Sequence, residues 1–214
     1  MPIFRTGDTS VLFLHIPKTG GTSIERAFEA AGWNTELRDG RSGKANPNWV
    51  RRVSPQHFHT EVLESWLMFE RFDAIFTVVR DPLRRFVSDF IWSMRNDKTV
   101  DTSAAALEVW AEKTLRRAIA NPWVLDNHMR PQVEYLHPLA HVHKFEDGLG
   151  TAMERLRAAT GFDVPTDIKH SLESSKIANV RSADIEISDR VKQLVSNFYR
   201  EDYRVLGYEP PFHL

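Results

Sequence analysis

The residues best suited to chemistry lie near the start of the chain, where a lysine, two glycines and three hydroxyl residues occur within positions 18–23 (KTGGTS). The mostly apolar residues 11–15 predict a buried strand before this segment, and Pro17 ends that strand. Helical spacing begins at Ile24. A strand, a glycine-rich turn and a helix N-terminus together favour phosphate binding, because backbone N–H groups, the helix dipole and the lysine charge all face the anion.

This segment differs from the usual phosphate-binding loop of nucleotide kinases. That loop follows the pattern G-x-x-x-x-G-K-[ST], in which the lysine comes after the glycines. Here Lys18 precedes Gly20 and Gly21, and no glycine lies five residues before the lysine. The loop is therefore expected to be tighter, and a nucleotide kinase is not the preferred interpretation.

A second segment favours another phosphate site. Residues 72–79 predict a central strand of a parallel sheet, and Arg80 follows at its carboxyl end. Pro82 suits the first turn of a helix, with Asp81 as its N-cap. Ser88 lies two turns into that helix. An arginine at a strand end and a helix hydroxyl are suitable ligands for a second phosphate.

Strands alternate with predicted helices along the whole chain, which indicates one α/β domain over residues 1–214. We expect a three-layer fold like that of the phosphate-loop proteins, with a central parallel sheet flanked by helices. Beyond the first helix, helices are expected at 60–69, 82–94, 103–120, 148–160 (ended by Gly161) and 187–199 (N-capped by Ser188), and a short strand at 140–145. Ligands bind such sheets at the carboxyl ends of the strands.

The composition excludes several classes of protein. The 214 residues are 42% hydrophobic and 27% charged, with a net charge of -1, so no overall attraction to nucleic acid or acidic membranes is expected. There is no cysteine, which excludes disulfides and cysteine-bound zinc. The chain shows no signal-peptide pattern and no apolar stretch long enough to span a membrane. We therefore expect a cytoplasmic enzyme.

Together, the two phosphate segments resemble the sulfotransferases that use 3′-phosphoadenosine-5′-phosphosulfate (PAPS) and release 3′-phosphoadenosine-5′-phosphate (PAP). The resemblance implies that the first loop holds the 5′-phosphosulfate and that Arg80 and Ser88, with Arg85 as a further candidate, hold the 3′-phosphate. The implied donor-binding residues are Lys18, Thr19, Gly20, Gly21, Thr22, Ser23, Arg80 and Ser88.

The segment Gln56-His57-Phe58 resembles the Gly-His-Phe-like segment that carries the catalytic base in the polysaccharide branch of that family, although Gln56 replaces the usual glycine. The resemblance implies that His57 takes the acceptor proton. Its neutral form can do so, with a midpoint near the ordinary pKa of about 6.5 unless burial shifts it. His59 is a second candidate, and in an extended segment it would face the same side as His57.

Later segments at 127–132, 144–147 and 199–208 also resemble that branch. His128, Arg130 and Gln132 could face the acceptor or pin a helix to the sheet, and His15 is expected to be a buried strand histidine with its hydrogen bonds satisfied. Lys176 and Arg181 could close over the nucleotide.

The resemblance implies an enzyme that transfers a sulfuryl group from PAPS to a hydroxyl, with a carbohydrate as the expected acceptor. Lys18 would stabilise the charge that grows on the leaving phosphate, so no metal is required. Two alternatives stay open. One is an ATP-dependent kinase in which Asp81 holds Mg²⁺, and the other is a nucleotide-binding module without activity.

Overall fold

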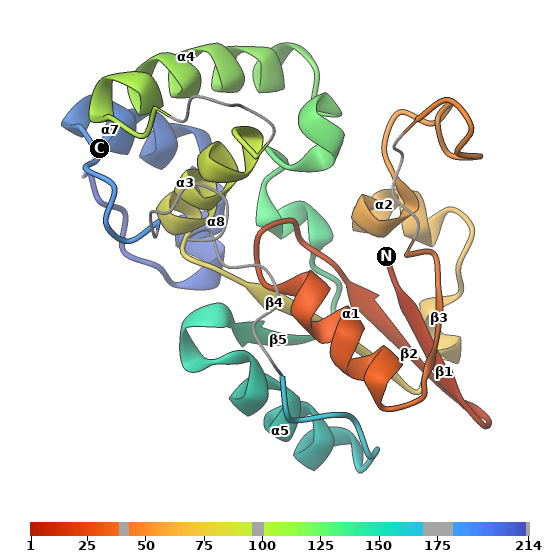
Figure 1. Cartoon of the computed structure of the whole chain (residues 1–214). Coiled ribbons are helices and arrows are strands. Elements are labelled where there is room, and N and C mark those ends of the chain that lie inside the picture. Colours follow the sequence, from red (N-terminus) through yellow and green to blue (C-terminus); the bar gives the residue numbers. More distant parts are fainter. Residues whose placement is uncertain (39–42, 96–100, 169–181, 213–214) are drawn as a thin grey trace.

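The computed structural model describes residues 1–38, 43–95, 101–168 and 182–212, and its centre is a five-stranded sheet with helices on both faces (Figure 1). The strand order is β3-β1-β2-β4-β5. The strands are β1 (Ile3–Thr6), β2 (Thr9–Leu14), β3 (Asn34–Glu36), β4 (Ala74–Val79) and β5 (His141–Lys144).

The sheet is mostly parallel, as the sequence predicted, except that one strand, β1, runs in the opposite direction. β2 pairs with β4, and β4 with β5, in parallel register, whereas β1 runs antiparallel to both of its neighbours. Only Gly7 and Asp8 separate β1 from β2, and Gly7 has a positive φ of 53°. Because a connection this short joins only antiparallel neighbours, the hairpin fixes the direction of β1.

The helices largely follow the predicted positions. They are α1 (Gly21–Ala30), α2 (Thr60–Glu64), α3 (Pro82–Ser93), α4 (Ala104–Ala120), α5 (Leu149–Thr160), α7 (Asp189–Phe198) and α8 (Arg200–Leu206). The short 3₁₀ helices are η1 (Pro55–His57), η2 (Phe69–Arg71), η3 (Val124–Asn127), η4 (Gln132–Tyr135) and η5 (Phe145–Asp147).

The predicted helix caps are confirmed. The Asp81 carboxylate accepts a hydrogen bond from the Arg84 N–H, Ser188 caps α7, and Gly161 ends α5 in the left-handed conformation. The helix expected at 60–69 was too long, because α2 ends after Glu64. The Ser65 hydroxyl there donates to a backbone carbonyl inside the turn, an interaction that competes with helix continuation.

Alternating side chains of β4 build a separate core on each face of the sheet. Phe76 and Val78 pack with residues of α1 and α5, whereas Ile75 and Val79 pack with residues of α2, η4 and α8. This confirms the expected helical layers on both faces. None of the helices in the described ranges is long and apolar enough to cross a membrane.

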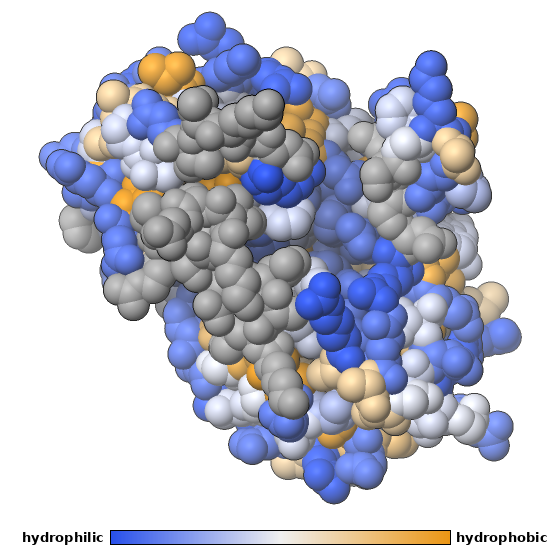
Figure 2. All heavy atoms as spheres, viewed as in Figure 1, coloured by the Kyte–Doolittle hydropathy of each residue, from blue (hydrophilic) through white to orange (hydrophobic). Residues whose placement is uncertain are grey.

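A third core joins α3, α4 and α7 beyond the carboxyl end of β4 (Figure 1). The connections that leave β2 and β4 therefore lie between the sheet and this group of helices. The face in Figure 2 is mostly hydrophilic, with small hydrophobic patches scattered over it.

Candidate active site

A cavity of about 560 Å³ lies at the carboxyl ends of β2 and β4. It brings together most of the residues that the sequence singled out, from the loop after β2, from η1, from the end of β4 and from the second half of α3. The predicted residues that line it are Lys18, Gly20, Gly21, Thr22, Ser23, His57, Arg80 and Ser88. Thr19 and His59 are not among its lining residues.

The loop after β2 is shaped by its glycines and by Thr19. The buried Thr19 hydroxyl donates to the Ile16 carbonyl at 2.8 Å, so it closes the loop from inside. Gly20 has a φ of 90° and begins α1. A Cβ on Gly21 would lie 2.0 Å from Nε2 of His15, so only glycine fits beneath that ring. The packing thus requires the two glycines.

Lys18 reaches into the cavity from this loop. Its Nζ lies 4.3 Å from the centre of the Trp92 ring, a cation–π contact. Burial lowers the pKa of Lys18 from the ordinary 10.5 to about 8, while the charge of Asp89 opposes that shift. The charged ammonium is therefore still the main form of Lys18 near neutral pH, although it loses its proton at a lower pH than a surface lysine does.

Arg80 is fixed at the end of β4. Its guanidinium donates to the Lys18 carbonyl at 3.2 Å and lies over the Phe145 ring. The buried Gln132 side chain accepts from the Arg80 N–H and donates to the Arg80 carbonyl. Gln132 therefore pins the strand end, which decides between the two roles left open for it.

Two further arginines hold the segment that follows η3. Arg85 is buried and donates to the backbone carbonyls of His128 and Arg130. Arg130 is also buried, and its Nε donates to the Asn127 side chain at 3.2 Å. Both arginines lie outside the cavity lining. Their contacts are those of residues that support the site.

His57 lies on η1 with its ring at the cavity wall. Its Nδ1 is 2.9 Å from Oδ2 of Asp126, which also accepts the Ser54 hydroxyl at 2.6 Å. Burial lowers the pKa of His57 from 6.5 to about 3, although the hydrogen bond to Asp126 opposes the shift. The imidazole is thus neutral near pH 7, and the midpoint is far below the ordinary value of about 6.5.

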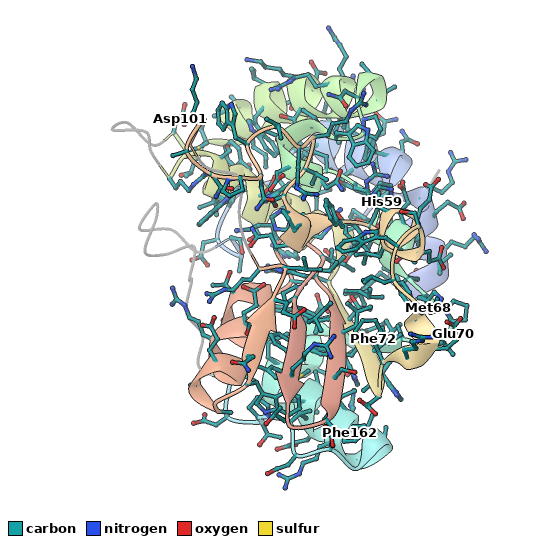
Figure 3. All side chains as sticks on the ribbon, turned by 90° about the vertical axis from the view of Figure 1, so that its right-hand side faces the viewer. His59, Met68, Glu70, Phe72, Asp101 and Phe162 are labelled. Carbon is teal, nitrogen blue, oxygen red and sulfur yellow. The ribbon has the colours of Figure 1, made fainter. Side chains whose placement is uncertain are left out.

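His59 occupies a different environment, at the N-terminus of α2 (Figure 3). Its Nε2 is 3.7 Å from the Glu61 carboxylate, and its ring packs edge-on against Trp123. The expected extended segment is not present, because η1 includes His57 and α2 begins right after His59. The two histidines are therefore not side by side on one face.

Three histidines at the cavity are each paired with a carboxylate. The ring centres of His15 and His128 lie 5.3 and 5.0 Å from that of His57, and all three rings line the cavity. The pairs, with the distance from Nδ1 to the carboxylate, are His15–Glu25 at 2.7 Å, His57–Asp126 at 2.9 Å and His128–Asp89 at 2.5 Å. Asp126 and Asp89 favour a hydrogen on Nδ1 of His57 and His128. The Nδ1 atom of His15 lies near Glu25 without a hydrogen bond of suitable geometry to any described residue, so the expectation that its hydrogen bonds are satisfied is not met.

Sequence reasoning missed the three carboxylates. Glu25 and Asp89 lie within predicted helices, and Asp126 is 69 positions from His57. In the sequence, each of these carboxylates is marked only by the apolar residues next to it, and that pattern is too common to identify a functional residue. Among the residues that the structure describes, no group of three or more His, Asp or Glu side chains could hold a metal ion. Lys176 and Arg181 fall outside those residues.

Comparison with known proteins adds one finding. A family model described as "Sulfotransferase family" matches residues 1–209, almost the entire chain. No match was found among curated proteins or among solved structures.

Proposed function

The chain belongs to the sulfotransferase family, and on that premise we propose that it transfers a sulfuryl group from PAPS to the hydroxyl of an acceptor, with a saccharide as the acceptor class. The observation that carries the proposal is the single cavity that joins the loop at Lys18, the pair Arg80 and Ser88, and the neutral imidazole of His57. Its volume lies in the range of about 300–1,000 Å³ that is usual for small-molecule sites.

The donor site would use two groups of residues that line this cavity. The backbone of residues 20–23, at the N-terminus of α1, would bind the 5′-phosphate as in other loops that precede a helix. Arg80, which directly follows β4, and Ser88 on α3 would bind the 3′-phosphate. We assign the fold to the phosphate-loop type on this arrangement of strand, loop and helix.

The proposed reaction is a single in-line displacement. The acceptor O–H bond breaks as its oxygen bonds to sulfur, and the proton passes to Nε2 of His57. The bond between sulfur and the bridging oxygen breaks at the same time, so PAP leaves with that electron pair on its 5′-phosphate. Lys18 would stabilise the growing negative charge, and fixed cations of this kind are a main source of rate enhancement.

The kinase alternative is disfavoured by the position of Asp81. Its carboxylate caps α3 by accepting the Arg84 N–H at 2.8 Å, and Asp81 is not among the cavity-lining residues. A carboxylate used in this way is poorly placed to hold a nucleotide-bound Mg²⁺ in the cavity. The inactive-module alternative predicts binding without turnover.

The deciding experiment is titration calorimetry with PAP, AMP and ATP, without added Mg²⁺. PAP should bind at least about tenfold more tightly than AMP, because charge-assisted contacts to the 3′-phosphate are worth about 1.5–3 kcal/mol. Arg80→Ala should remove most of that preference, whereas Arg84→Ala, an exposed arginine on α3 outside the cavity lining, should keep it. Equal affinity for PAP and AMP would refute the 3′-phosphate site, and Mg²⁺-dependent phosphoryl transfer from ATP would favour the kinase.

A further inference from the structure

We infer that Asp126 is a positioning residue, which fixes the His57 imidazole in the tautomer and orientation that leave Nε2 as the proton-accepting atom. The expected effect on rate depends on the sulfuryl transfer proposed above. The tautomer itself does not, because it can be measured in the resting protein.

The hydrogen bonds around Asp126 determine where the imidazole hydrogen lies. Oδ1 accepts the Ser54 N–H at 2.6 Å, and Oδ2 accepts the Ser54 hydroxyl at 2.6 Å and faces Nδ1 of His57 at 2.9 Å. Burial raises the pKa of Asp126, but the hydrogen bonds from His57 and Ser54 and the charge interaction with His57 outweigh it, so the pKa lies well below its usual range and the group is an ionised carboxylate. Since a carboxylate only accepts, Nδ1 must carry the hydrogen and Nε2 the lone pair.

The backbone that presents Asp126 is strained. Leu125, Asp126 and Asn127 have positive φ angles of 51°, 59° and 65° in succession, and none of them is glycine. Crowding between the Cβ atom and the carbonyl oxygen disfavours this conformation, most strongly at Leu125, since Asp and Asn tolerate it better. A disfavoured turn persists only where its surroundings hold it, and strain of this kind gathers at functional sites.

The same turn holds the His57 segment at a second point. The Asn127 side chain is fully buried, and its Nδ2 donates to the His57 carbonyl at 3.0 Å. Asp126 therefore holds the ring while Asn127 holds the backbone of the same residue. Two contacts from adjacent residues leave the imidazole little freedom to rotate away from the cavity.

Asp126 also acts on the basicity of His57. Burial disfavours the imidazolium, as do the nearby rings of His15 and His128, whereas the hydrogen bond and charge of Asp126 favour it. The carboxylate thus supports the positive charge that forms when Nε2 takes a proton. A purely structural anchor for Ser54 would have no need to face the ring or to line the cavity, yet Asp126 does both.

The test is Asp126→Asn, read out by long-range proton–nitrogen correlation NMR of the histidine side chains. His57→Gln identifies the His57 signals by their loss. The wild-type ring should carry its hydrogen on Nδ1. In Asp126→Asn the amide N–H₂ can donate to Nδ1, so the hydrogen should move to Nε2, and turnover should fall about 10²–10⁴-fold. PAP affinity should stay unchanged.

Ser54→Ala is the matched control. It removes the hydroxyl that donates to Oδ2 of Asp126, but it keeps the backbone N–H bond to Oδ1 and the carboxylate against His57. The hydrogen should remain on Nδ1, and turnover should fall less than about tenfold. A wild-type ring with its hydrogen on Nε2 overturns the inference without any variant at position 126, and so does an Asp126→Asn protein that keeps its rate. A wild-type ring with its hydrogen on Nδ1, in a protein that transfers no sulfuryl group, would refute the proposed function and uphold the orientation of His57.

Discussion

Lys18 and Arg80 place two cationic side chains against one cavity, and both are mostly withdrawn from water. Arg80 donates to the Lys18 carbonyl, and its charge lowers the pKa of Lys18. Burying the Lys18 ammonium next to Arg80 costs free energy. The cation–π contact with Trp92 and the attraction to the Asp89 charge partly offset that cost. A bound anion would relieve the repulsion between the two cations, so this arrangement suits a ligand with more than one negative group.

The lowered pKa of Lys18 predicts how the reaction rate depends on pH. Because the ammonium is lost as the pH rises through about 8, kcat/KM should fall on that alkaline side and be highest below it. Lys18→Arg keeps its charge and should remove the alkaline decline, while Lys18→Ala should fold and lose about 10²–10³-fold in turnover. Rate-versus-pH profiles of the three proteins, with their melting temperatures, test this. An unchanged decline in Lys18→Arg would show that another group titrates.

Local elements were predictable where a few neighbouring residues decide the structure. The Asp81 and Ser188 caps, the Gly161 end of α5 and the glycines of the first loop each depend on contacts within a few positions. The antiparallel β1 and the left-handed turn at 125–127 were not predicted. That turn has no glycine to signal it, and contacts with residues far away in the sequence hold it in place.

The elements around His57 and His59 place only His57 at the cavity. η1 places His57 at the cavity, whereas His59 precedes α2 and packs on Trp123. We therefore predict that His57→Ala lowers turnover about 10²–10⁴-fold with PAP affinity unchanged, and that His59→Ala costs less. Single-turnover rates, PAP calorimetry and melting temperatures of both variants check this. Full activity in His57→Ala together with a large loss in His59→Ala would reverse the assignment.

The whole molecule explains why the residues at the two strand ends were easier to bring together from the sequence than the residues around His57. The residues proposed for the donor phosphates lie in two short segments that directly follow strands, so the topology alone brings them together. Two of the three histidine–carboxylate pairs instead join η1 to η3 and α3 to the residue after η3. Their geometry depends on how α3, α4 and α7 pack beyond the sheet, which pattern and spacing do not specify.

Burial of neutral histidines should make the entire fold sensitive to mild acid. The pKa of His57 is lowered to about 3, and burial lowers the pKa values of His59 and His143 to about 4. Below about pH 6.5 the unfolded chain protonates these residues while the folded protein does not. The unfolded state then binds more protons, so stability is fully present above that pH and falls as the pH drops.

For each such histidine the slope should rise from about 0.7 kcal/mol per pH unit at about pH 6.5 toward about 1.4 at about pH 5, above the range in which most carboxylates titrate. Urea unfolding at several pH values in this window measures the slope. His57→Gln should reduce this slope by the contribution of one histidine, because glutamine does not titrate. The variant and the wild type should be compared at the same ionic strength. A slope that His57→Gln leaves unchanged would mean that His57 already takes up its proton in the folded protein, and that the neutral imidazole proposed as the base is not the resting state.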